Sequence, residues 1–415
     1  MLKGCGVCIS FLQLPLTVHY LSTIEYGIWV TLLTMMTWIN RLDMGIGLGV
    51  RNNLAIAVSL GNIERAKAYI STGIFAMFGI ASILMVIFWT GIQFIDEQIV
   101  FNTKAISNDV LHSVVAWTGT FFIITFFMSI ISQFYYAYQE AAKTGMLELS
   151  NSIIMLVLVY YLTLQETHNI LYFVFAFGIA SISSKLLFSF YFFIKHIEVT
   201  PDFSLVSKKV MKNITGIGIK FFIIQLCTIF CFSVANVLVT QLFGPEYVRS
   251  YDIVFKLMNF SVMIQSLILT PLWSAYTDAY ARNDIEWIKA TLRKTNLLLL
   301  IFIPALCLIA WKIEFLVDVW LHIEFSCEPS FLILMVIYNS MLLLFGNYCN
   351  VLNGIGAINI QLLAYVVGAS LVVPLSYTFS IIFKLGIDGI ALTYDIVFAF
   401  LSILVMWHYY YLLKK

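Results

Sequence analysis

Residues 62–92 read NIERAKAYISTGIFAMFGIASILMVIFWTGI, a short polar head followed by a long apolar run. The apolar part, residues 69–92, contains no Asp, Glu, Lys or Arg. It is long enough to cross a hydrocarbon core of about 30 Å as an α-helix. This stretch therefore predicts one transmembrane helix.

Similar apolar runs recur along the whole chain with short polar breaks between them, and they predict an all-α membrane protein of about twelve spans. The expected spans are residues 4–20, 27–50, 69–92, 111–136, 147–165, 170–194, 217–241, 250–276, 295–312, 330–350, 361–383 and 387–411. The first run continues to about residue 20 and has no cleavage site of small residues, so it is interpreted as a span and not as a removable signal peptide.

The composition excludes a water-soluble protein. Of 415 residues, 61% are hydrophobic and 11% are charged, and the mean hydropathy is +0.94. No polar stretch is long enough for a separate soluble domain. The net charge of +1 and the lack of a clustered basic surface argue against nucleic acid as a partner. We expect membrane lipids to surround most of the chain.

The distribution of Lys and Arg predicts the orientation. If the N-terminus is cytoplasmic, the cations expected on that side outnumber those on the other side by fifteen to four. Positive charge is retained on the cytoplasmic side of membrane proteins. Both termini are therefore expected in the cytoplasm.

An internal repeat divides the chain into two halves. Residues 62–68 (NIERAKA) match residues 284–290 (DIEWIKA) at an offset of 222 positions, and a Glu-Tyr pair precedes each copy, at 25–26 and 246–247. Both copies follow the second expected span of their half. We therefore expect two six-helix lobes, 1–200 and 201–415, that run in the same direction and are related by a pseudo-twofold axis along the membrane normal. Such an architecture places a central cavity between the lobes.

Several motifs resemble a known family. They are EYGIW at 25–29, then Asp43, Gly45, Gly47, Gly49, Arg51 and Asn52, then PLWS at 271–274 with Thr277, Asp278 and Ala279, and finally Asn353, Gly354 and Gly356. Together they are similar to bacterial polysaccharide or O-antigen repeat-unit flippases of the Wzx type. These belong to the MOP superfamily, which also holds the multidrug and toxin extrusion (MATE) carriers. Such proteins usually begin several residues further upstream, so the first span, which contains Pro15, is expected to be short and tilted unless the chain start is mis-set.

The resemblance implies a MATE-like fold and a transport function. The cargo would be an undecaprenyl-diphosphate-linked glycan, carried by alternating access across the bacterial inner membrane for O-antigen or other surface polysaccharide. Polysaccharide polymerase and chain-length proteins are the protein partners that this function implies. We expect no enzymatic activity, no cofactor and no metal. The sequence contains no Walker motif, so ATP is not expected to drive transport directly.

A diphosphate and a string of sugar hydroxyls need a hydrated, cationic path through the membrane, because buried charges and unpaired polar groups are costly there. Ionisable residues within spans are the default functional candidates. The candidates for substrate binding are Arg41, Lys185, Lys220, Lys256 and Trp273. The alternative for these residues is a structural role. Arg41 would then extend to the membrane–water interface or pair with an acid on another helix, and Trp273 would belong to an interfacial aromatic belt.

Four acids are candidates for coupling or gating: Asp43, Asp252, Asp278 and Asp395. Asp43 precedes a glycine-rich stretch. Asp252 lies four residues before Lys256, so the two share a helix face and either neutralise each other or exchange a proton against substrate. Asp278 has the same spacing to Arg282. Asp395 lies deep in the last span, where it either carries a coupling proton or bonds to a neighbouring helix.

Two other functions stay open. A drug or cation exporter of the same fold would need acids in its cavity, whereas the cations inside these spans favour an anionic cargo. An integral membrane glycan-modifying enzyme would need a large acceptor-binding loop or an intramembrane histidine with a partner at motif spacing, and the sequence offers neither.

Overall fold

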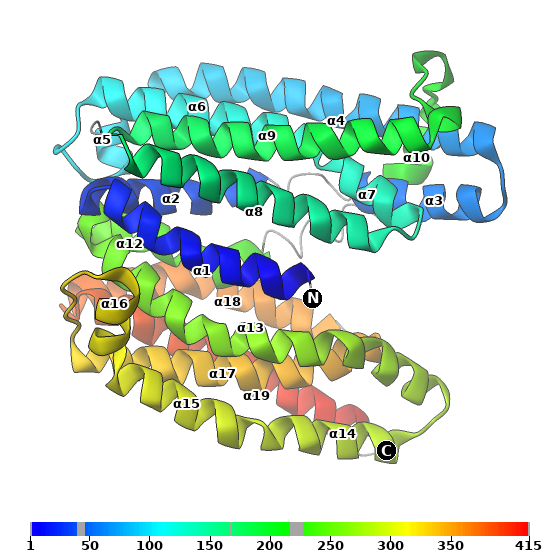
Figure 1. Cartoon of the computed structure of the whole chain (residues 1–415). Helices are drawn as coiled ribbons and strands as arrows, with labels where there is room; N and C mark the ends of the chain where they lie inside the picture. Colours follow the sequence, from blue (N-terminus) through cyan, green and yellow to red (C-terminus); the bar gives the residue numbers. More distant parts are fainter. Residues whose placement is uncertain (1, 40–45, 166–167, 216–226, 358, 414–415) are drawn as a thin grey trace. The chain divides into compact units, whose positions relative to one another are not determined.

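The computed structural model describes residues 2–39, 46–165, 168–215, 227–357 and 359–413. Every regular element in these ranges is a helix, so the predicted all-α class is confirmed (Figure 1). Packing divides the chain into two compact units, Met1–Leu226 (unit 1) and Cys227–Lys415 (unit 2).

Nine helical segments of the described part are long and apolar enough to cross a membrane. They are Ile63–Phe94, Asn108–Ala137, Ala141–Thr163, Ile170–Lys195, Pro245–Ala281, Ile285–Trp311, Pro329–Gly354, Asn359–Ile382 and Ile387–Leu412. The remaining expected spans, 4–20, 27–50 and 217–241, fall on shorter helices or run through residues outside the described ranges.

Unit 1 is a bundle whose long helices lie side by side (Figure 1). Its helices are α1 (Leu2–Tyr20), α2 (Thr23–Ile39), α3 (Ile46–Ser59), α4 (Ile63–Gly91), α5 (Glu97–Val100), α6 (Asn108–Met128), α7 (Ile130–Ala137), α8 (Ala141–Thr163), α9 (Ile170–Lys195) and α10 (Lys208–Thr215). The basic segment after α9 packs back onto its own unit, because α10 contacts α3 and α4.

Unit 2 repeats this arrangement. Its helices are α12 (Ala235–Phe243), α13 (Pro245–Ala281), α14 (Ile285–Leu297), α15 (Leu299–Trp311), α16 (Ile313–Leu321), α17 (Pro329–Gly354), α18 (Asn359–Tyr377) and α19 (Ile387–Leu413). Proline begins α13 and α17, where its fixed φ suits the first helical position. The pairs α13–α14, α17–α19 and α18–α19 correspond to the pairs α3–α4, α6–α9 and α8–α9 of unit 1.

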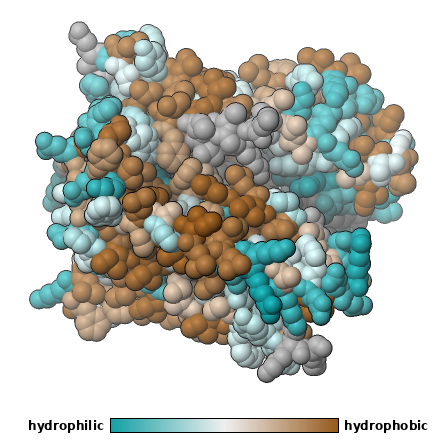
Figure 2. All heavy atoms as spheres, turned by 60° about the horizontal axis from the view of Figure 1, so that its bottom comes forward, coloured by the Kyte–Doolittle hydropathy of each residue, from teal (hydrophilic) through white to brown (hydrophobic). Residues whose placement is uncertain are grey.

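The surface fits a lipid environment. The segment Ile285–Trp311 is only 11% buried over its most apolar window. Its exposed side chains include Leu300, Ile301 and Trp311, each at least 66% exposed. Figure 2 shows one face of the molecule on which hydrophobic residues cover a broad area. Soluble monomers rarely expose apolar surface of this extent, and it is the surface that lipid chains would contact.

Candidate functional site

The sequence-predicted site residues are only partly described by the structure. Arg41, Asp43 and Lys220 lie outside the described residues. Lys185 lies on α9 of unit 1, and the other five candidates lie on two helices of unit 2. Asp252, Lys256, Trp273 and Asp278 are on α13, and Asp395 is on α19.

Asp395 is buried in the core of unit 2. The residue is 6% exposed, and neither carboxylate oxygen has a hydrogen-bond partner in the described part of the chain. Its helix, α19, packs against α12, α17 and α18. An isolated carboxylate in such surroundings costs several kcal/mol when charged, and such groups in spans usually mark ion or proton pathways.

Two tyrosines from other helices lie within electrostatic range of this carboxylate. Tyr251 on α13 and Tyr338 on α17 both interact electrostatically with Asp395. The ring of Tyr338 also packs edge-on against that of Tyr394, with centroids 5.5 Å apart. Two other helices of unit 2 therefore each bring a tyrosine into electrostatic range of one buried acid.

Asp252 and Lys256 form an ion pair one turn apart on α13. The Nζ of Lys256 lies 2.6 Å from Oδ2 of Asp252. The Asp252 side chain is 5% exposed and that of Lys256 is 42% exposed, so a partly exposed lysine pairs with a buried carboxylate. Tyr251 interacts electrostatically with Asp252 as well as with Asp395. We call Tyr251, Asp252, Lys256, Tyr338 and Asp395 the acidic core of unit 2.

The other described candidates have different surroundings. Half-buried Lys185 interacts with Glu148 of the neighbouring helix α8. Asp278 pairs with Arg282 at 3.0 Å, but both side chains are at least 60% exposed, as at a solvated helix end. Trp273 is 49% exposed, and its carbonyl oxygen accepts a hydrogen bond from the Thr277 hydroxyl.

Sequence reasoning missed a chain of uncharged polar groups in unit 2. Nε2 of Gln265 donates to the carbonyl oxygen of Leu343 at 2.7 Å and to Oδ1 of Asn347 at 3.0 Å. Asn347 then donates to Oδ1 of Asn296 at 2.9 Å, and Asn296 to the Tyr348 hydroxyl at 3.4 Å. Amide side chains inside apolar runs are the signal that could have revealed this network.

A pair in unit 1 with one buried partner was also missed. Glu97 on α5 is 1% exposed, and its Oε1 lies 2.7 Å from Nδ1 of His112 on α6. The two residues are fifteen positions apart, which is not a motif spacing, so only the fold brings them together.

Comparisons with known proteins identify the fold. No protein-family model and no curated protein sequence matches the chain. Solved structures do match. An inward-facing multidrug resistance transporter of the MATE family, in the MOP superfamily, has a TM-score of 0.80 at 14% identity, over 99% of this chain and 96% of that chain.

Two further structures extend this similarity. An outward-facing MATE family transporter has a TM-score of 0.65 at 14% identity, over 99% of this chain and 94% of that chain. A MOP superfamily transporter from Pyrococcus furiosus, described as having a binding pocket of reverse polarity and a different function, has a TM-score of 0.67 at 15% identity with the same coverage. The chain therefore has the MATE transporter fold, as predicted, and its structural neighbours are transporters.

Proposed function

We propose that this protein is a flippase of the inner membrane, with both termini in the cytoplasm. It moves an undecaprenyl-diphosphate-linked oligosaccharide repeat unit from the cytoplasmic to the periplasmic leaflet, for O-antigen or similar surface polysaccharide. The fold supports transport by alternating access, since structures of this fold include inward-facing and outward-facing conformations. A polymerase and chain-length proteins would receive the flipped unit.

The observation that carries the proposal is the Lys256–Asp252 pair, whose carboxylate interacts with the same tyrosine, Tyr251, as Asp395 does. An ammonium within a span is costly unless it is paired or functional. Here its partner Asp252 is buried, while the side chain of Lys256 is 42% exposed. A diphosphate is the kind of anion that a point charge of this type binds.

The acidic core supplies a means of releasing and rebinding the cargo. When Asp252 is ionised it neutralises Lys256, and the site has little attraction for an anion. When Asp252 takes a proton, its carboxyl group no longer balances the positive charge of Lys256, which can then attract a diphosphate. Asp395 is a second proton acceptor near the same tyrosine. Coupling to a proton gradient would require these acids to take up a proton from one side of the membrane and release it to the other.

Complementation of a flippase-deleted strain, scored by surface glycan, tests the proposal. We expect Lys256→Gln and Asp395→Asn each to lower surface glycan at least tenfold, and Arg41→Gln and Lys220→Gln to weaken it. Lys104→Gln, an exposed loop substitution that also removes one positive charge, should leave it unchanged. Protein abundance in the membrane must be equal in all strains. Full complementation by Lys256→Gln and Asp395→Asn would exclude this role of the acidic core.

A second candidate is a MATE-like exporter of drugs or cations. Two buried carboxylates near Tyr251 favour it, because acids inside a carrier suit a positively charged cargo. Deletion of the gene separates the two functions. Loss of surface glycan supports the flippase, whereas unchanged glycan with greater sensitivity to cationic dyes supports the exporter.

A further inference from the structure

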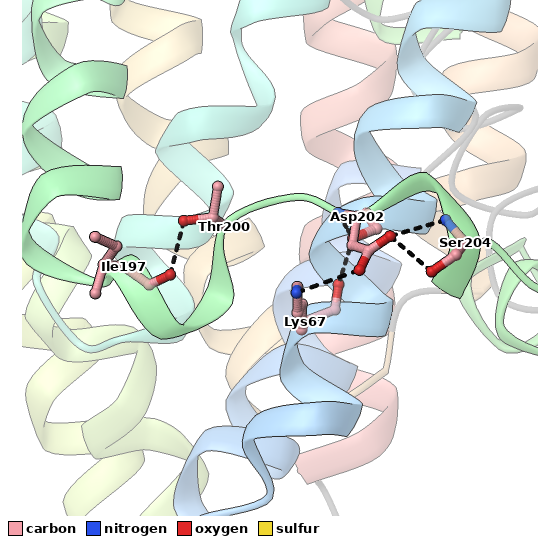
Figure 3. A network of polar contacts seen from close by, with 6 residues as sticks. Lys67, Ile197, Thr200, Asp202 and Ser204 are labelled. Carbon is pink, nitrogen blue, oxygen red and sulfur yellow. Dashed lines mark hydrogen bonds and ion pairs between the residues drawn. The ribbon is translucent and has the colours of Figure 1, made fainter.

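In unit 1 a carboxylate from a distant segment neutralises a lysine near the start of α4. Oδ2 of Asp202 lies 3.4 Å from Nζ of Lys67 (Figure 3). The backbone N–H of Asp202 also donates to the Ser71 hydroxyl at 2.9 Å. Hydrogen bonds from the Ser204 hydroxyl and backbone N–H, together with Lys67, hold the pKa of Asp202 below its ordinary value. The chain thus places an anion of its own on the first turns of α4.

The repeat defines the equivalent place in unit 2. At an offset of 222, Lys67 corresponds to Lys289 and Ser71 to Arg293, both on α14. Within the described ranges, no acidic side chain forms an ion pair with Lys289 or Arg293. Unit 2 therefore has two cations at these positions where unit 1 has one, and in residues 227–357 and 359–413 no carboxylate pairs with them.

These two cations line a cavity of about 480 Å³. The other lining residues are Leu292 and Asn296 of α14, Tyr348 of α17, and Tyr409 and Tyr410 of α19. The hydroxyls of Tyr348 and Tyr410 lie 3.4 Å apart. Tyr348 also accepts from Asn296, so the cavity is the outer end of the amide network that begins at Gln265.

The chemistry of the lining selects a class of ligand. Two cations with hydroxyl and amide donors match a phosphate group, whose several oxygen atoms accept charge-assisted hydrogen bonds. The volume exceeds what a lone inorganic anion needs and falls in the range of small-molecule sites. The aromatic and aliphatic wall suits a ligand with an apolar part. This end of unit 2 is the side on which the Lys and Arg distribution predicts the cytoplasm, where basic pockets between transmembrane helices bind anionic lipid headgroups.

We propose that this cavity binds the phosphate group of an anionic membrane lipid, with Lys289 and Arg293 as its cationic ligands. The lipid takes the place that Asp202 occupies on the equivalent helix of unit 1. This site lies on α14, α17 and α19 and is separate from the acidic core that we propose for transport, so it does not depend on the transported cargo.

Native mass spectrometry of the purified full-length protein tests the site. The detergent-solubilised protein is titrated with phosphatidylglycerol or, in parallel, with zwitterionic phosphatidylcholine of the same acyl chains. We expect one phosphatidylglycerol to bind more tightly than the others, and the Lys289→Gln/Arg293→Gln double variant to bind it at least tenfold more weakly. Phosphatidylcholine binding should be the same in both proteins.

Two variants serve as matched controls. Lys294→Gln removes a cation from the same helix but not from the cavity lining, and Lys67→Gln removes the repeat-equivalent cation that Asp202 already neutralises. Both should retain tight phosphatidylglycerol binding. Equal binding of the lipid by the wild type and the double variant, or an equal loss in Lys294→Gln, would overturn the proposal.

A third arm distinguishes a lipid from a soluble phosphate compound. Inorganic phosphate is added at millimolar concentration while the Tm is measured. We expect phosphatidylglycerol to raise the Tm of the wild type but not that of the double variant, and phosphate alone to raise neither. A Tm that phosphate alone raises in the wild type, and not in the double variant, would overturn the assignment to a lipid.

Discussion

Asn62 and Asp284 cap equivalent helices of the two units with the same hydrogen bond. Each Oδ1 accepts from the backbone N–H three residues later, Arg65 or Trp287, at 2.9 Å in both cases. The turns before them also match: Gly61 and Asn283 have φ of +66° and +59°. The sequence repeat is therefore a repeat of backbone geometry at the same offset of 222 residues.

These caps should contribute similarly to stability. We expect Asn62→Ala and Asp284→Ala each to lower the free energy of unfolding by about 1 kcal/mol, because each leaves a helix N–H without its acceptor. Asn62→Asp and Asp284→Asn retain the acceptor and should cost much less. Denaturant unfolding in detergent, followed by tryptophan fluorescence, measures the difference. A loss as large in the retaining variants as in the alanine variants would show that the capping bond is not responsible.

Gly389 lies where α19 passes close to another backbone. A Cβ at this position would lie 2.5 Å from the backbone nitrogen of Ser380, which cannot move aside as a flexible side chain can. Gly389→Ala is therefore expected to destabilise the protein by about 1–3 kcal/mol or more. Gly79→Ala on α4 is the control, since a Cβ there meets nothing within 4 Å. It should leave the Tm unchanged or raise it. A neutral Gly389→Ala would contradict the close packing of α19 against the segment containing Ser380.

Glu140, between α7 and α8, should make stability depend on pH in acid. Burial raises the pKa of Glu140, but hydrogen bonds and charge from Lys195 and His196 lower it by more, so it stays below its ordinary value of 4.5. A carboxyl whose folded-state pKa is depressed stabilises the fold above its unfolded-state pKa and loses that effect as the pH falls through the folded-state value.

The Tm of the wild type and of Glu140→Gln, measured from about pH 7 to about pH 3, checks this linkage. The advantage of the wild type should be constant above pH 4.5 and shrink below it. Glu324→Gln, an exposed loop change, should show no such trend. A difference between wild type and Glu140→Gln that does not vary with pH would mean that the carboxylate is not involved.

The amide network predicts a strong coupling between two residues. Gln265 is 3% exposed and Asn347 is 1% exposed. Gln265→Leu leaves Oδ1 of Asn347 and the carbonyl of Leu343 without this donor, at a cost of about 1–3 kcal/mol. Adding Asn347→Leu should recover part of that loss, because it removes the unpaired amide of Asn347. Asn296, which then loses its bond from Asn347, borders the cavity and can bond to water instead. If the two losses simply add, the residues are not coupled in the folded state.

Much of the fold could be predicted from the sequence, because membrane spans and their repeat depend on local composition. A run such as 69–92 can be assigned as a membrane span from its own length and apolarity alone. The match of residues 62–68 with 284–290 likewise gave both the repeat and its offset. The Asp252–Lys256 pair was predictable for the same reason, since residues four apart on a helix share a face.

The rest of the site depends on contacts between helices that are far apart in the chain. Tyr251 and Asp395 are on α13 and α19, and no spacing rule relates them. Whether Lys185 meets Glu148, or Glu97 meets His112, depends on how each helix is rotated about its axis. Periodicity constrains that rotation poorly in spans that are apolar on every side.

The length of α13 has a mechanical consequence. Its 37 residues extend about 55 Å, well beyond a hydrocarbon core of about 30 Å. One continuous helix therefore carries Lys256, eleven residues after its first residue, and Asp278, three residues before its last, with Pro271 inside the helix between them. If α13 tilts about Lys256 as a rigid helix, Asp278 moves by a large distance. The alternative is that the helix bends at Pro271 and Asp278 stays in place.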